Sequence, residues 1–429
     1  MYPPSDINRA APLIMHIDLN SAFATAEQQA HPSLRGQPIG VTNRISTHCC
    51  VIAASYEAKA QGVRVGMRLS EARQLAPGFI ILESDPAKYH HIYTKLLAIM
   101  RDYSPAVTMK SIDEGVIDFK GTDVHNGHRS LCDIGYEIKQ RVRAEIGSWM
   151  RINVGIGPNH FLAKQAASWH KPDGLDVLDY HNLRPYYRHI TLTDLSGIAQ
   201  HYEARLKAAG IYTPLAFLDA PMAVLRRQVF QSVVGEDWYK RLRGYEVDDQ
   251  PTKLGSIGRQ FVLDVRSMDE APLLARFQYL CETTARKLRY RSVNARGVLV
   301  WVQLQSGESW YVRKMHKASF CSNYDVYQRA LYLFGQRPRT SPVAVMGITC
   351  YQLEPSSKHQ PSLFEADNKQ VWLSAAIDEV NERYGMFTLG SAPAISAQDK
   401  VQQKIPFGGT EYFRLLLGGQ ATDQAMDHR

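Results

Sequence analysis

The periodicity of hydrophobic and polar positions divides the chain into three regions and a tail. In the first region, short apolar runs of strand length alternate with stretches of helical period. We expect strands at 13–18, 38–41, 50–54, 107–111, 115–119 and 152–156, and helices that begin near 19, 56, 69, 88, 130 and 160. An antiparallel sheet with helices on one face, in an α+β fold, fits this order best.

The second region, 180–245, has only short helical segments, and the polar, proline-containing stretch at 247–254 predicts a linker. In the third region the period alternates between two and 3.6 residues. It predicts strand 256–263, helix 268–288, strands 296–305 and 309–317, helix 323–333 and strand 343–353. This βαββαβ order is that of a split βαβ sandwich. In the tail we expect a helix at 371–384 and a mobile end from Ser391 onward.

Composition narrows the class of protein. A length of 429 residues suggests about three domains. No apolar run reaches membrane-spanning length and the first ten residues lack a signal-peptide core, so we expect a cytoplasmic protein without a membrane partner. The six cysteines show no CxxC spacing, which argues against a zinc site or a disulfide framework.

The net charge of +8 is concentrated in the third region, where residues 255–355 contain 14 Lys and Arg but only 7 Asp and Glu. A polyanionic partner such as nucleic acid is the economical interpretation, and a solvated basic face is the alternative.

The strongest candidate chemistry is the carboxylate pair Asp113 and Glu114, which lies between the strands expected at 107–111 and 115–119. Neighbouring side chains on a straight strand point to opposite faces, so only a bend such as a hairpin tip lets both reach one cation. Asp18, which closes the first apolar run, could add a third carboxylate to a Mg²⁺ site. Taken alone, an acidic pair in a turn is more often merely solvated.

Other polar positions fit a phosphate-bearing substrate. Asn20 or Ser21 can cap the helix that follows Asp18, and the N-terminus of that helix offers N–H groups to a phosphate. Tyr56 and Lys59 share a helix face and could hold a triphosphate. A half-buried Tyr beside a solvated Lys is the plainer alternative.

Four segments together resemble the Y-family, or translesion, DNA polymerases in order and spacing. They are IDLNSAFA at 17–24, ASYEAK at 54–59, SIDE at 111–114, and FLAK at 161–164 followed by Lys171-Pro172. The SIDE match is the most specific, and the resemblance extends from about residue 13 to 364.

The resemblance implies a multidomain right-hand polymerase. Its parts would be a palm at 1–33 and 80–178, fingers at 34–79, a helical thumb at 179–246, a linker at 247–254, a βαββαβ little finger at 255–355 and a tail at 356–429. The little finger would lie in the major groove of the DNA.

The resemblance also implies residue roles. Asp18, Asp113 and Glu114 would be catalytic and, with the backbone carbonyl of Leu19, would hold two Mg²⁺ ions. The nucleotide-binding residues would be Phe23, Ser21, Ala22, Tyr56, Lys59 and Lys164. Phe23 matches the steric gate that leaves no room for a ribose hydroxyl. Three positions depart from the family pattern: Ala22 replaces a frequent second aromatic, Ala53 an occasional hydroxyl, and Gly115 the usual Ala.

Two further motifs concern partners. Gly197, Ile198 and Ala199 resemble the turn of a helix-hairpin-helix, which offers N–H groups to a DNA phosphate, although Ala199 replaces the usual second Gly. Gln360, Leu363 and Phe364 resemble the short motif by which bacterial polymerases bind the sliding clamp.

The implied function is template-directed addition of deoxynucleoside triphosphates to the 3′ end of primer–template DNA, with low fidelity and lesion bypass in DNA repair. Two alternatives remain: a catalytically weak or inactive family member that serves as a DNA- and clamp-binding adaptor, and a nucleotide cyclase with a similar palm. The long tail favours the polymerase V-like branch over the polymerase IV-like branch, and the aromatic gate is compatible with either.

Overall fold

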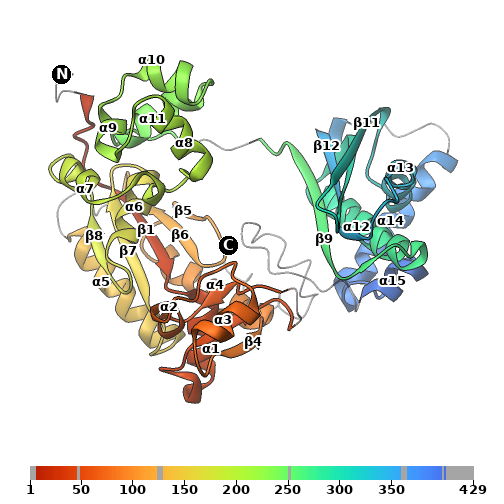
Figure 1. The fold of residues 1–429 in the computed structure, drawn as a ribbon, viewed down its shortest axis with the longest axis horizontal. Coiled ribbons are helices and arrows are strands. Elements are labelled where there is room, and N and C mark those ends of the chain that lie inside the picture. The colour runs from red at the N-terminus through yellow and green to blue at the C-terminus, as the bar shows by residue number, and fades with distance from the viewer. Residues whose placement is uncertain are drawn as a thin grey trace. The chain divides into compact units, whose positions relative to one another are not determined.

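The computed structural model describes residues 6–45, 49–122, 129–249, 253–358, 365–398 and 401 (Figure 1). Contacts within the chain divide it into two compact units, one before and one after residue 251. This division falls inside the predicted linker at 247–254. Over the described part of the chain, every helix is too short or too polar to span a bilayer.

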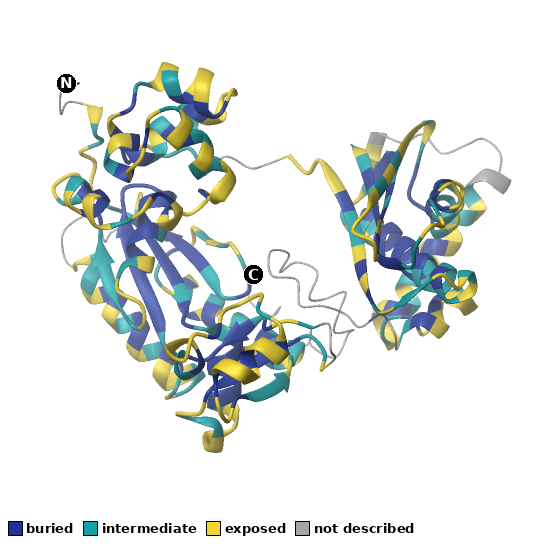
Figure 2. Cartoon of the chain, in the orientation of Figure 1, coloured by how far each residue is buried: buried dark blue, intermediate teal, exposed yellow. Residues whose placement is uncertain are grey.

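A five-stranded sheet forms the centre of the first unit. Its order is β5 (Val107–Met109), β6 (Glu114–Asp118), β1 (Ile14–Leu19), β7 (Ile152–Gly157) and β8 (Leu175–Val177). Neighbouring strands are antiparallel except β7 and β8, which are parallel. The sequence did not predict β8, because three residues are too few to show an alternating pattern. The innermost strands are almost fully buried, as the dark blue ribbons in Figure 2 show.

Helices cover both faces of this sheet, so the expectation of helices on one face is wrong. On one face lie α4 (Pro86–Arg101) and α5 (Leu131–Arg141): a Cβ on Gly115 would meet Met100 of α4, and one on Gly135 of α5 would meet Val154. On the other face lies α6 (His160–Trp169), whose backbone comes so close to Gly155 that a side chain there would collide with it. A strand that is apolar along its whole length is typical of a sheet buried on both faces.

A smaller three-stranded sheet follows α1 (Ala22–Ala30) and η2 (Pro32–Leu34) in the chain. Its order is β3 (Ala53–Ala54), β2 (Ile39–Thr42) and β4 (Ile80–Glu83), with the helices α2 (Tyr56–Ala60) and α3 (Leu69–Leu75). The sequence did not predict β4, which pairs in parallel with β2. The expected fingers boundary at residue 79 therefore falls just before a strand that belongs to the same sheet.

Residues 183–242 form short helical segments joined by turns, as expected. The elements are α7 (Leu183–His189), η5 (Leu192–Asp194), α8 (Gln200–Ala208), α9 (Pro214–Asp219), α10 (Met222–Val224), η6 (Leu225–Val229) and α11 (Val234–Leu242). In the turn before α8, Gly197 has a φ of +98°, which favours glycine, and it lies over the ring of Trp238. Gly197 and Ala199 are exposed, whereas Ile198 is buried and its N–H donates to the carbonyl of Leu195.

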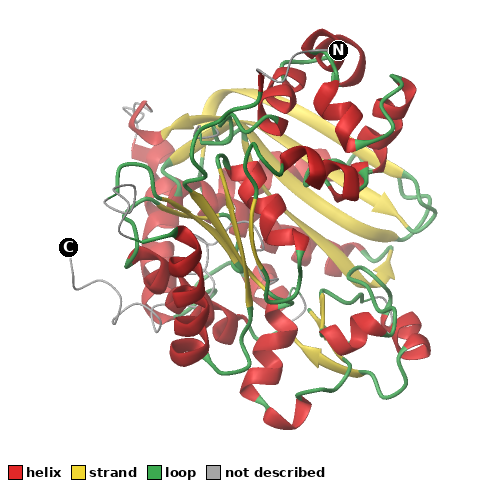
Figure 3. Cartoon of the chain, turned by 90° about the vertical axis from the view of Figure 1, so that its left-hand side faces the viewer, coloured by secondary structure: helices red, strands yellow, loops and turns green. Residues whose placement is uncertain are grey.

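The second unit has the predicted βαββαβ order. It consists of β9 (Ser256–Ser267), α12 (Glu270–Tyr290), β10 (Val293–Leu304), β11 (Ser309–Phe320), α13 (Asn323–Phe334) and β12 (Val343–Pro355). The four strands form an antiparallel sheet in the order β11-β10-β12-β9. Figure 3 shows these strands in yellow and the helices in red.

The described part of the tail, after η7 (Ser356–Lys358), packs onto the second unit as α14 (Glu365–Tyr384) and α15 (Ala392–Gln398). The expected mobile end from Ser391 is therefore wrong as far as residue 398. Ala394 and Ala397 are buried in the core of the unit, and Phe387 stacks on Tyr279 of α12 at 4.5 Å between ring centroids. The packing of α15 could not be predicted from the sequence, because its small side chains form only a weak apolar stripe.

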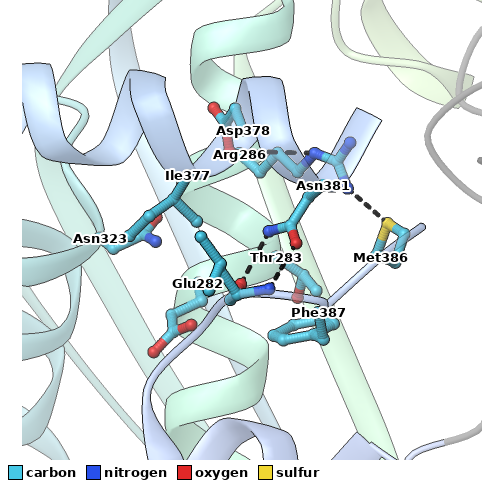
Figure 4. A pocket seen from close by; sticks show the side chains of 10 residues that line it. Glu282, Thr283, Arg286, Asn323, Ile377, Asp378, Asn381, Met386 and Phe387 are labelled. Atoms are coloured by element: carbon cyan, nitrogen blue, oxygen red, sulfur yellow. Dashed lines mark hydrogen bonds and ion pairs between the residues drawn. The ribbon is translucent and has the colours of Figure 1, made fainter. Parts of the chain in front are cut away.

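Polar contacts fix the same segment to α12. Asp378 forms a bidentate ion pair with Arg289, at 2.6 and 2.8 Å, and Asn381 exchanges two hydrogen bonds with the backbone of Leu389. Figure 4 shows the small pocket that Asp378 and Asn381 line together with Glu282 and Arg286. The clamp-motif residues Gln360, Leu363 and Phe364 lie outside the described residues.

Candidate active site

The candidate acidic residues meet where β1 and β6 run side by side. Asp18 at the end of β1 lies opposite Glu114, the first residue of β6, and also opposite Asn153 of β7. Because directly paired residues point to the same face of a sheet, the Asp18 and Glu114 carboxylates emerge together on the face that α6 covers. The hairpin predicted around Asp113 and Glu114 is present as β5 and β6.

The imidazole of His16 lies in the same cluster as the Asp18 and Glu114 carboxylates. His16, Asp18 and Glu114 each offer one ligand atom, and these atoms all lie within 4.8 Å of one another. Oxygen donors at this separation fit a hard divalent cation. The sequence interpretation missed His16, because it stands in a run read as apolar. Its position two residues before Asp18, on the same face of the strand, was the available signal.

Asp113 occupies the bend before β6 and is not part of that three-residue group. Its Oδ1 accepts a 2.5 Å hydrogen bond from Ser111 Oγ, and its backbone carbonyl accepts one from the N–H of Leu19. Burial raises the pKa of the Asp113 carboxyl against the opposing effect of the Ser111 hydrogen bond, and the charges of Asp18 and Glu114 raise it further. The third acid therefore interacts electrostatically with the other two.

Two lysines neutralise the cluster. Lys164 of α6 donates to both oxygens of Glu114, at 2.9 and 2.8 Å, and Lys171 donates to Oδ1 of Asp18 at 2.8 Å. Burial alone would raise the pKa of Glu114, but the contacts of His16 and Lys164 outweigh it and lower the pKa to about 2. Lys164 thus points to the acidic hairpin, as its spacing suggested. Lys171 was missed as a site residue although the Lys-Pro pair contributed to the resemblance.

The residues expected to hold a nucleotide form a second group beside Asp18. Lys59 donates to Ser21 Oγ at 2.7 Å and lies 4.8 Å from the ring centre of Tyr56. Burial raises the pKa of Tyr56 to about 12, with the Ser21 hydrogen bond opposing and the Asp18 charge adding to it. Burial also lowers the pKa of Lys59, and repulsion from Lys171 lowers it further. Lys59 and Lys171 are therefore close enough to repel each other electrostatically.

The expected side-chain cap at the start of α1 is absent. Ser21 occupies the N-cap position with a φ of +47°, and its side chain makes no capping hydrogen bond there. The Asn20 side chain instead donates to Asn153 and accepts from the N–H of Asp173, each at 2.8 Å. Tertiary contacts to β7 and to the segment after α6 thus replace the local cap.

Phe23 is buried, with 3 % of its surface exposed, and its ring stacks on Tyr89 at 4.4 Å between centroids. It lines a small pocket with Ala22, Leu19 and Asp113, so the proposed gate adjoins the acidic hairpin. The departure at Gly115 also has a structural reason: a Cβ there would lie 2.6 Å from the sulfur of Met109 and 2.8 Å from Met100.

Known proteins match both units of the chain. The impB/mucB/samB family matches residues 17–168, and the C-terminal domain of the same family matches residues 255–363. The chain is 34 % identical to a DNA polymerase IV of Moorella thermoacetica over 87 % of its length and 93 % of that relative. The chain belongs to the Y family of DNA polymerases. As a member of this family it is a metal-dependent DNA-directed DNA polymerase.

Other comparisons agree with this assignment. A DNA polymerase IV of Pelotomaculum thermopropionicum is 29 % identical over 91 % of this Y-family chain and 97 % of the relative. A solved Y-family chimera of Dbh and Dpo4 has a TM-score of 0.68 at 20 % identity, over 80 % of this chain and 99 % of its own, which shows the right-hand fold. An insertion ternary complex of Dbh DNA polymerase has a TM-score of 0.54 at 21 % identity, over 80 % of this chain and 99 % of that one.

Both of these relatives carry the name DNA polymerase IV. The α14–α15 segment follows the end of the matched C-terminal domain at residue 363.

Proposed function

We propose that this Y-family polymerase adds templated deoxynucleotides to a primer 3′ end and releases pyrophosphate, with two Mg²⁺ ions at the acidic cluster. The observation that carries the proposal is the convergence of Asp18 and Glu114 on one face of the sheet, with Asp113 beside them and cationic side chains around them. When bound, the two ions would lower the pKa of the primer hydroxyl and stabilise the charge that develops on the leaving pyrophosphate.

The proposed roles follow from position. Asp18 and Asp113 would be ligands of both ions, the Leu19 carbonyl would be a further metal ligand, and Glu114 would favour the ion at the primer end. Lys164 forms an ion pair with Glu114 and Lys171 forms one with Asp18. Cationic side chains therefore already offset part of the negative charge of the site. Phe23 would lie against the sugar of the incoming nucleotide, next to Ser21 and Ala22.

Lys171 is a better candidate for triphosphate binding than Lys164. Lys171 interacts with Asp18 and influences Lys59, whereas Lys164 interacts with Glu114 at the hairpin. A charge-assisted contact is worth about 1.5–3 kcal/mol, so Lys171→Ala should raise the KM for the nucleotide by about 10- to 100-fold. Lys164→Ala should act mainly on kcat. Steady-state kinetics with one templated base separate the two effects, and an unchanged KM in Lys171→Ala would refute this assignment.

The partners proposed for this chain are primer–template DNA, deoxynucleoside triphosphates and a sliding clamp. The basic little finger and the exposed Gly197 turn of the thumb support DNA binding, as does the likeness to a polymerase solved as a ternary complex. The small fingers sheet would enclose the nascent base pair loosely, which supports low fidelity and lesion bypass. Error rates on undamaged templates test this proposal, because the accuracy of a proofreading enzyme would contradict it.

Primer extension tests the central proposal. The full chain, given Mg²⁺ and a primer–template, should add the complementary deoxynucleotide, and removal of the metal by a chelator should stop the reaction. An inactive adaptor would bind the DNA and add nothing. A nucleotide cyclase would release pyrophosphate from a nucleoside triphosphate without DNA.

A further inference from the structure

A buried polar side chain stands in β1, the central strand of the five-stranded sheet. His16 has 2 % of its surface exposed, and its neighbours Met15 and Ile17 are fully buried. Burying a polar group without a hydrogen bond costs free energy, so such a group is retained where its partner matters. The partner of His16 is Glu114: its Nε2 lies 3.2 Å from Oε2.

The local fold brings His16 and Glu114 together. His16 pairs in register with Val116 of β6 and with Gly155 of β7, so it is a diagonal neighbour of Glu114 on the same face. Because Gly155 has no side chain, the backbone of α6 lies against the sheet beside His16. That helix carries Lys164, which donates to both carboxylate oxygens of Glu114.

The two contacts differ in rigidity. Lys164 has a long side chain that is 38 % exposed, whereas the His16 ring is enclosed on a central strand. A lysine also offers a mobile charge that can follow the carboxylate, while an imidazole N–H fixes a direction. Since an ionised carboxylate only accepts hydrogen bonds, Nε2 carries the proton in this contact.

We propose that His16 is a positioning residue for Glu114: it holds Oε2 by a hydrogen bond so that the carboxylate presents a fixed orientation at the primer end of the active site. The inference rests on the proposed polymerase function. His16 does not touch the reacting atoms. Its role resembles that of the hydrogen-bond partners that orient metal-binding carboxylates, whose loss typically costs about 10- to 100-fold in affinity or rate.

The test compares His16→Phe, which keeps an apolar ring, with His16→Gln, whose amide N–H can restore the contact. In the full chain bound to primer–template, His16→Phe should lower kcat by about 10- to 100-fold and leave the KM for the nucleotide unchanged. It should also weaken Mn²⁺ binding, measured by electron paramagnetic resonance on a complex with a dideoxy-terminated primer. His16→Gln should recover most of both losses.

Met15→Leu is the matched control, because Met15 is equally buried on the opposite face of β1 and should leave both readouts unchanged. Thermal unfolding without metal separates positioning from a structural role. Glu114 keeps its hydrogen bonds from Lys164 when His16 is replaced, so no buried acceptor loses its last partner, and His16→Phe should unfold near the wild-type temperature. The inference is overturned if His16→Phe keeps full activity, if its losses follow unfolding, or if His16→Gln is equally impaired. Wild-type chain that extends no primer would instead refute the proposed function.

Discussion

Replacing Asp113 by asparagine should abolish primer extension without weakening DNA binding. Asparagine keeps the shape of the side chain and can keep the hydrogen bond to Ser111, but it removes the negative charge that two metal ions would share. Losing several kcal/mol of electrostatic stabilisation corresponds to a rate reduction on the order of 10³-fold or more. Single-turnover extension at saturating nucleotide measures the rate, and fluorescence anisotropy with labelled primer–template measures binding.

This variant should fold at least as well as the wild type. Burial and repulsion from Asp18 and Glu114 raise the pKa of Asp113, so its ionised form costs folding free energy at any pH above that pKa. Removing the charge removes that cost at neutral pH. Asp118→Asn, at the other end of β6, is the matched control and should extend primers normally. Normal extension by Asp113→Asn itself would refute the catalytic assignment.

Replacing Phe23 by alanine should raise ribonucleotide incorporation relative to deoxynucleotide incorporation by about 10²-fold. The ring stacks on Tyr89 and lines, with Tyr89 and Asp113, the pocket where it would meet the C2′ position of the sugar. A shorter side chain leaves room for the 2′-hydroxyl. Competition between matched ribo- and deoxynucleotides opposite one template base measures the ratio of their kcat/KM values.

Stability has to be controlled in this experiment. Truncating a buried phenylalanine to alanine costs about 3–5 kcal/mol, so Phe23→Leu, which retains more volume, should be measured in parallel. Tyr89→Phe keeps the stacked ring and removes the hydrogen bond to Glu27. It should leave sugar discrimination unchanged. If both Phe23 variants fold and discriminate between the sugars like the wild type, Phe23 is not the gate.

The sequence predicted those parts of the structure that local pattern determines. The βαββαβ order of the second unit could be predicted because each element is long and the period switches clearly, as at β10 and α13. Asp18 and the β5–β6 hairpin could be placed because they lie at the ends of recognisable strands. The short strands β4 and β8 could not, since each has too few residues to show a period.

Tertiary contacts account for what the sequence did not reveal at the site. His16 and Lys171 matter because folding brings them to Glu114 and Asp18, across 98 and 153 positions of sequence. Lys171 has no local signal that distinguishes it from a solvated lysine, and the only local signal for His16 is its place two residues before Asp18 on the same face of the strand. The absent cap at Ser21 is a similar case, because Asn20 and Ser21 make their hydrogen bonds to distant residues.

The helices α14 and α15 change the status of the clamp motif. In a terminal tail the motif would have one attached end and one free end. Here β12 and η7 precede residues 359–364, and α14, held to α12 by Asp378, follows them. Residues 359–364 therefore stand in the sequence between two elements of the folded second unit, and a truncation meant to remove the motif would also remove the segment whose Phe387 and Ala394 pack into the core of that unit.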